Sequence, residues 1–196
     1  MTSHSSKFAL AFMLVVAVSF EPASADIVTN SGFESGDFTG WSLSGAVNGS
    51  TRVSDNVFDP TAIHVHSGTF GVVSGPGAGG TVFLAQDVAT TVGGSYIVSF
   101  SLANNNPAFG NAFSFNWNGI PLINLPNPGG AFGFTDFSVL VHGTGNDSLQ
   151  FALRHDGSAW GLDDVAVSAI PAPGAIVLLA TGLGCLGFNR RRIATV

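Results

Sequence analysis

Short runs of β-prone residues, each closed by a cluster of turn-forming residues, constrain the fold of this chain more than any other feature. In YIVSFSLA (96–103) the even-numbered residues are aromatic or aliphatic, whereas serines occupy positions 99 and 101. A period of two places alternate side chains on opposite faces of a strand. This run therefore predicts a strand with one buried face.

The same pattern recurs along the middle of the chain. The other clear runs are residues 82–89, 112–117, 134–141, 148–154 and 162–168, and the turn clusters are residues 75–80, 92–95, 127–130 and 143–147. No stretch long enough for a helix shows a 3.6-residue period there. Repeated short strands with glycine-rich turns are typical of two packed antiparallel sheets. We therefore predict an all-β, jelly-roll-like β-sandwich over residues 26–168.

Charge limits the partners of this predicted domain. Arg52 and Arg154 stand against eleven aspartates and glutamates, so two minus eleven gives a net charge of −9 for residues 26–168. Binding of a phosphate backbone needs clustered lysine and arginine, which excludes nucleic acid as an expected partner. The chain has one cysteine, Cys185, so an intrachain disulfide is excluded as well.

The first 25 residues have the order of a signal peptide. Lys7 precedes an apolar run of 13 residues, 8–20, and Ala23 and Ala25 then supply a small-x-small cleavage pattern. A run of this length suits the apolar helix of a signal peptide and is short for a bilayer span. We expect cleavage after Ala25 and export of the chain; the alternative is a buried N-terminal helix.

Residues 169–196 form a second apolar segment. The run 174–188 is followed by Arg190, Arg191 and Arg192. It predicts a short transmembrane helix of about 22 Å, whose arginines extend to the membrane surface. Arginines that follow an apolar run mark the cytoplasmic side, so the β-domain is expected to face outward. A core helix is the alternative, but the run contains glycines and has no polar face.

Three carboxylates are candidates for a metal site. Glu34 lies near the first predicted strand, and Asp163 and Asp164 lie in the last one. First and last strands commonly lie side by side, and gathered carboxylates suit Ca²⁺, which takes six to eight oxygen ligands. Asp163 shares its parity with two valines and is expected to point inward, where it needs a partner. The two interpretations are a structural calcium site and hydrogen-bonded carboxylates that brace a turn.

Tryptophans and histidines supply further candidate residues. Trp117 and Trp160 are candidates for stacking on sugar rings, provided that their indoles are exposed. His64 and His66 have the spacing of a metal-chelating pair on one strand face, without a third ligand nearby. No arrangement of nucleophile and base supports catalysis. We therefore expect a non-enzymatic protein.

The last part of the chain resembles a known sorting signal. PAPGAIVLLATGLGCLGFNRRR (171–192) is similar to the PEP-CTERM segment of Gram-negative bacteria that produce exopolysaccharide. The resemblance implies that the segment is recognised by exosortase, a membrane protease-transpeptidase. It also implies that the protein resides in the inner membrane only transiently. Pro171, Ala172 and Pro173 stand at the signature tripeptide. The family usually has glutamate where this chain has Ala172, but both prolines still favour an extended, accessible segment.

The middle of the chain resembles the β-sandwich ectodomains attached to that signal. The similar stretches are NSGFESGDFTGW (30–41), HSGTFGVVSGP (66–76), FSFNWNGIPL (113–122) and WGLDDVAVS (160–168). Those domains are similar to carbohydrate-binding jelly rolls that carry a structural calcium. The resemblance implies a protein of the cell surface or extracellular matrix that contacts polysaccharide. The alternatives are an extracellular glycan hydrolase, which needs two carboxylates at a fixed separation, and a purely structural matrix protein.

Overall fold

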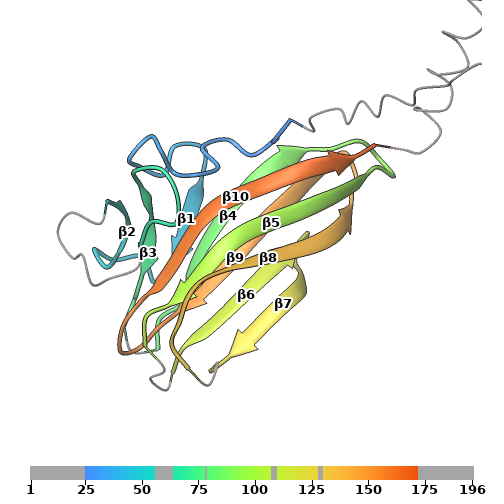
Figure 1. Ribbon diagram of the computed structural model, residues 1–196. Coiled ribbons are helices and arrows are strands. Elements are labelled where there is room, and N and C mark those ends of the chain that lie inside the picture. The colour runs from blue at the N-terminus through green and yellow to red at the C-terminus, as the bar shows by residue number, and fades with distance from the viewer. Residues whose placement is uncertain (1–24, 56–63, 78, 107–109, 128–129, 172–196) are drawn as a thin grey trace, which may run out of the picture.

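Two packed β-sheets form the domain. The computed structural model describes residues 25–55, 64–77, 79–106, 110–127 and 130–171. Within these ranges it contains ten strands in two five-stranded sheets, and every strand pairing is antiparallel (Figure 1). The predicted all-β sandwich is confirmed. The expected signal helix and the expected helix at 174–188 lie outside the described residues.

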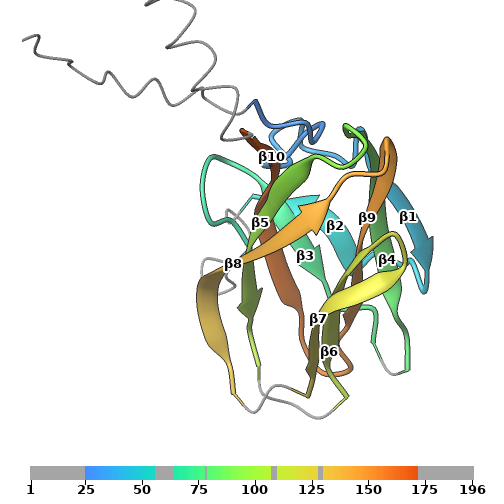
Figure 2. The same ribbon diagram turned by 90° about the vertical axis from the view of Figure 1, so that its right-hand side faces the viewer.

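The two sheets differ in strand order. One has the order β1-β4-β9-β6-β7, with β1 at Ser42–Gly45, β4 at Val82–Ala89, β9 at Asn146–Arg154, β6 at Ala112–Trp117 and β7 at Ile120–Pro126. The other has the order β2-β3-β10-β5-β8, with β2 at Thr51–Ser54, β3 at Gly71–Ser74, β10 at Trp160–Ile170, β5 at Ser95–Asn104 and β8 at Phe132–His142. Figure 2 shows the two layers from the side.

The start and the end of the domain lie next to each other. Asp26 forms an isolated bridge with Ser168 in β10, and its carboxylate accepts a hydrogen bond of 3.0 Å from Val167 N. Ile27 N donates to Val167 O at 3.2 Å. No helix in the described part of the chain is long and apolar enough to cross a membrane.

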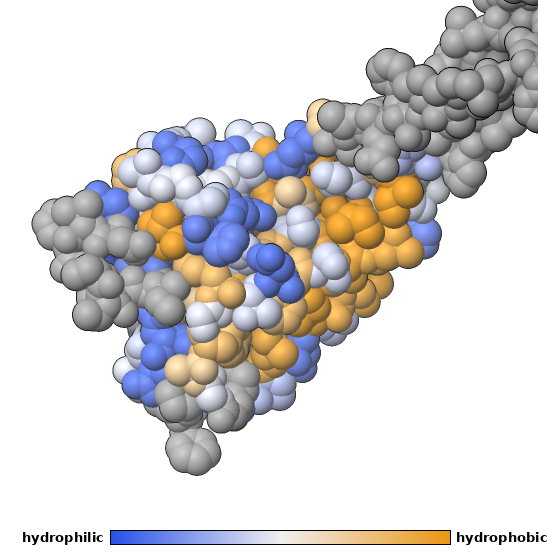
Figure 3. Space-filling view, viewed as in Figure 1, coloured by the Kyte–Doolittle hydropathy of each residue, from blue (hydrophilic) through white to orange (hydrophobic). Residues whose placement is uncertain are grey.

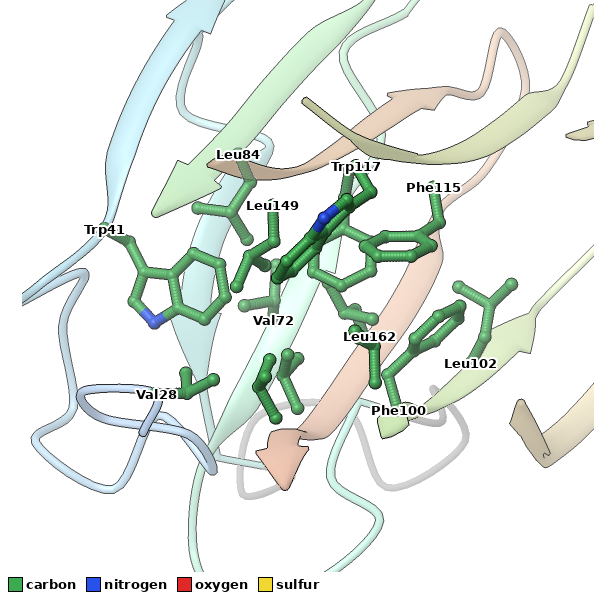
Figure 4. Packing of buried hydrophobic residues seen from close by; sticks show 14 of the residues in the cluster. Val28, Trp41, Val72, Leu84, Phe100, Leu102, Phe115, Trp117, Leu149 and Leu162 are labelled. Atoms are coloured by element: carbon green, nitrogen blue, oxygen red, sulfur yellow. The ribbon is translucent and has the colours of Figure 1, made fainter. Parts of the chain in front are cut away.

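The two-residue period sorts side chains between the core and the surface. In β5, Tyr96, Val98, Phe100 and Leu102 are buried, whereas Ser99 on the opposite face is half-buried. The inward side chains of both sheets meet in an aromatic core, part of which is drawn in Figure 4. The ring of Phe100 meets that of Phe151 edge-on across the sandwich, with 5.1 Å between centroids. Such pairs add to the free energy of burial and fix the packing of the two layers.

One buried carboxylate fastens three turns at an end of the sandwich. Asp147 in β9 is fully buried and accepts hydrogen bonds from Thr144 N at 2.9 Å, Thr144 Oγ1 at 2.6 Å and Asn118 Nδ2 at 2.6 Å. The Thr90 hydroxyl donates to it as well. Burial by itself would raise the pKa of Asp147, but these donors outweigh it and lower the pKa to about 2.

Removal of this carboxylate tests its contribution to folding. We expect Asp147→Ala to lower the free energy of unfolding at pH 7 by about 2–4 kcal/mol, because four hydrogen-bond donors in three turns lose the one buried carboxylate that they share. Urea unfolding measures the change. Asp87→Ala removes an exposed carboxylate of β4 and serves as the control, with an expected change within about 0.5 kcal/mol.

The pH dependence of unfolding provides a second test of the Asp147 carboxylate. The folded pKa of about 2 lies below the ordinary value of 3.8, so the stabilisation is present above pH 4 and is lost as the pH falls toward 2. The difference between wild type and Asp147→Ala should shrink over that range. A difference that stays constant from pH 5 to pH 2 would show that the charge of Asp147 contributes nothing.

Candidate ligand-binding site

A short loop before β3 is held by backbone hydrogen bonds to two acidic side chains. His66 N and Ser67 N donate to Asp163 Oδ2 at 2.8 and 3.2 Å. Thr69 N and Phe70 N donate to Glu34 Oε1, both at 3.0 Å. Four of the five backbone N–H groups of loop 66–70, all except that of Gly68, therefore donate to a carboxylate. This loop carries His66 to the outer face of the β10 sheet.

Asp163 is the buried anchor of that arrangement. It has no exposed surface, and its Oδ1 accepts a third hydrogen bond, from Asp164 N at 2.7 Å. Burial raises the pKa of Asp163 to about 6, although the three backbone donors favour the charged form. The inward orientation expected from parity is therefore observed, together with the partners that an inward carboxylate needs.

A β-bulge turns the next side chain outward. The pairing of β10 with β5 shifts register between Asp163 and Ala166, and Asp164 there has a φ of 50°. A bulge adds one residue to a strand and redirects its side chain. Left-handed backbone is unfavourable for a residue other than glycine and is found where the surroundings enforce it. The Asp164 carboxylate consequently lies on the surface beside loop 66–70.

Asp164 binds two side chains of that loop. Its Oδ2 lies 2.6 Å from His66 Nδ1, and its Oδ1 accepts a hydrogen bond of 2.6 Å from Ser67 Oγ. The hydrogen bond to Asp164 raises the pKa of the His66 imidazole, and partial burial opposes the rise. The imidazole also packs against Phe134 of β8, with 5.1 Å between ring centroids. His66 is thus held in one orientation while its side chain remains 38% exposed.

A shallow depression of about 380 Å³ opens beside His66. It is lined by His66 and Asp164, by Ser99, Phe100 and Ser101 of β5, and by Asp136, Phe137 and Ser138 of β8. Ser101 Oγ donates to Asp136 Oδ1 at 2.6 Å. Figure 3 shows this face of the molecule: hydrophilic side chains gather over its middle, and a hydrophobic area lies nearer the C-terminal end of β10.

The side chains of the three predicted calcium ligands all pass near Gly32. A Cβ placed on Gly32 would lie 3.6 Å from Glu34 Cγ, 3.8 Å from Asp164 Oδ1 and 4.0 Å from Asp163 Oδ1. All three carboxylates accept hydrogen bonds from protein donors, which is the bracing arrangement. Among the described residues, no group of three or more His, Cys, Asp or Glu side chains is arranged to hold a metal ion. Calcium binding by these residues stays a prediction.

The two predicted sugar-stacking residues require a correction. Trp117 is 6% exposed and Trp160 is fully buried, and both belong to the core between the sheets (Trp117 is labelled in Figure 4). Their indole N–H groups donate to His142 O and Arg154 O, at 3.3 and 2.8 Å. Neither ring has a free face on which a sugar could stack. The parity of AFSFNW already aligned Trp117 with two buried phenylalanines, a signal that the prediction overlooked.

The residues around the depression were mostly not predicted. Only Asp164 and His66 were candidates, as a calcium ligand and as part of a histidine pair. The structure separates that pair, because His64 is buried and His66 lies on the surface. Strand alternation, which places side chains on the outer face, is the one sequence pattern that indicates Asp136, Ser99 and Ser138.

Comparison with known proteins supports the fold assignment. No protein-family model and no curated protein matches the chain. A carbohydrate-binding module, TmCBM61 in complex with β-1,4-galactotriose, has a TM-score of 0.56 and 19% identity, over 75% of this chain and all of that one. A cyclase from Fischerella sp. TAU has a TM-score of 0.53 and 16% identity, over 76% of this chain and 99% of that one.

A third similar structure belongs to a much longer protein. It is the enzymatically active domain of tailspike protein 4 of bacteriophage CBA120, with a TM-score of 0.55 and 12% identity, over 74% of this chain and 21% of that one. At these identities the likenesses show a common fold. The chain thus shares its jelly-roll-like sandwich with a carbohydrate-binding module, with a protein named as a cyclase and with one named as an enzymatically active domain.

Gly68 is the residue of loop 66–70 whose replacement tests the Glu34 anchor. Its φ is +67°, and a Cβ there would collide with the Glu34 carboxylate. We expect Gly68→Ala to lower the free energy of unfolding by about 2–3 kcal/mol, from a left-handed alanine and from displacement of that carboxylate.

The matched control is Gly93→Ala. Gly93 has a φ of +77° with no atom within 4 Å of the added Cβ, so it reports the backbone cost of about 1–2 kcal/mol alone. Thermal or urea unfolding of both variants gives the difference. Equal losses for the two variants would show that the Glu34 contact does not hold the loop.

Proposed function

We propose that this is an exported, non-enzymatic protein whose β-sandwich binds extracellular polysaccharide in the depression beside His66. The observation that carries the proposal is the set of polar side chains that converge there on one face of the sheet. Ser99 and Ser138 are directly opposite each other on β5 and β8, and so are Ser101 and Asp136. The shared fold with a galactotriose-binding module supports the proposal.

The chemistry of the depression suits a hydroxyl-rich ligand. Serine hydroxyls both donate and accept hydrogen bonds, and carboxylates accept them from sugar hydroxyls. The half-buried ring of Phe134 adds an apolar surface beside His66 for the C–H groups of a sugar ring. A depression on an open sheet face also leaves room for a polymer to continue past both ends of the site.

Blocking the depression tests its role in binding. We expect full-length protein to be retarded in affinity electrophoresis by at least one of β-1,4-galactan, xylan, hydroxyethylcellulose and glycol chitosan. Ser138 is exposed and points outward, so Ser138→Trp fills the depression without entering the core. This variant should lose at least ten-fold in affinity.

Ser44→Trp on the exposed edge strand β1 of the other sheet is the matched control and should bind as wild type does. The proposed site is wrong if Ser138→Trp binds normally. The proposed activity is wrong if the wild-type protein, shown to be folded, is retarded by none of these polymers.

We propose further that the two ends of the chain route it outward through a Gram-negative inner membrane. Residues 1–25 act as the export signal, and Pro171, Ala172 and Pro173 with the arginine cluster at 190–192 are read by an exosortase-type enzyme. The described part of β10 ends at Ile170. A truncation that begins at Pro171 therefore removes the sorting segment and keeps the sheet.

Cell fractionation tests this route. We expect full-length protein in the surface or matrix fraction, and protein without residues 171–196 in the periplasm or the medium, because its membrane stop is missing. Replacing Arg190, Arg191 and Arg192 by glutamine should also abolish normal sorting. Unchanged surface display of the truncated protein would contradict the proposal.

A further inference from the structure

We infer that the depression beside His66 selects a sugar that carries a positive charge, such as an unacetylated amino sugar, over neutral and anionic sugars. The inference rests on the proposed function and names the ligand class of the same site. It depends on the arrangement of charges and acceptors on the β5–β8 face.

Carboxylates dominate the charge of the depression. Asp136 and Asp164 line it, and the buried Asp163 lies directly behind loop 66–70. Of the lysines and arginines, the described residues contain Arg52 in β2 and Arg154 in β9, and neither lines the depression. Arg154 is paired with Asp156 at 2.8 Å. The imidazole of His66 also lines the depression and can become cationic, but it is already paired with Asp164 at 2.6 Å. A carboxylated or sulfated sugar would therefore meet a net negative charge here, with no lysine or arginine of the described residues to bind it.

Asp136, and not Asp164, is the carboxylate that is available to a ligand. Both oxygens of Asp164 already bind loop side chains, His66 and Ser67. Asp136 is exposed, and from the described residues its carboxylate accepts one hydrogen bond, from Ser101 Oγ to Oδ1. Its carboxylate therefore retains acceptor positions that face the depression.

Two serine hydroxyls lie near Asp136 on the β5–β8 face. Ser138 lies two residues further along β8 on the same face, and Ser99 stands opposite Ser138. An ammonium group has three donors and needs acceptors from several directions. One carboxylate and two hydroxyl oxygens provide them, whereas an N-acetyl group at the same position offers one donor and no charge.

A pair of oligosaccharides that differ in this group gives the test. Isothermal titration of full-length protein compares the β-1,4-linked tetramer of glucosamine with its fully N-acetylated form, at a pH where the amines are protonated. We expect the glucosamine tetramer to bind at least ten-fold more tightly, as for one added charge-assisted hydrogen bond. The preference should shrink when salt is raised from 20 mM to about 500 mM, because exposed charge pairs are screened.

Asp136→Asn keeps the shape of the side chain and an oxygen for Ser101, and it should bring the affinity ratio of the two tetramers close to one. Asp87→Asn, the same change on the exposed face of β4, should leave the ratio unaltered. Equal affinity of the two tetramers for wild type, or a ratio unaffected by Asp136→Asn, would overturn the inference. If the polymers of the preceding experiment still bind in a Ser138→Trp-sensitive way, the proposed function survives that result; if no sugar binds, both fail.

Discussion

The buried carboxylate of Asp163 is the interaction on which the proposed site depends. A charge removed from water needs donors, and here they are backbone N–H groups of His66, Ser67 and Asp164. Two of these belong to the loop before β3 and one to the bulge of β10. The need to satisfy one carboxylate therefore fixes two segments almost a hundred residues apart. The side chains that extend from them, His66 and Asp164, meet as a consequence.

The rest of the site follows from the regularity of the two neighbouring strands. In β5 and β8 the two-residue period that sends Phe100 and Phe137 against each other at the sheet interior also sends Ser101 and Asp136 outward as a facing pair. The register of β5 with β8 thus determines both which side chains enter the core and which lie on the surface. A slip of one residue would exchange them, so the packing of the phenylalanines specifies the position of the polar groups.

This dependence explains what could be predicted from the sequence. Alternation and glycine-rich turns predicted the all-β sandwich and six of its strands, because burial of one strand face leaves a local signal. β1, β2 and β3 are four residues each and β7 contains two prolines, so their alternation is too short or too irregular to detect. The pairing of His66 with Asp164 is set by tertiary packing, which leaves no local signal.

The open shape of the depression suits the binding of a ligand better than it suits catalysis. General acid–base and electrostatic catalysis gain most in sites that exclude water, where fixed charges act in a low dielectric. His66 is oriented by Asp164 in a manner that catalytic sites also use, but its side chain is more than one-third exposed on an open sheet face. Solvent there weakens the effect of each charge on a reacting bond. Recognition of a polymer does not require such exclusion of water, because several modest hydrogen bonds along the polymer add up. An open face also admits internal segments of the polymer as well as its ends. The exposure of His66 thus supports the binding role proposed for this site.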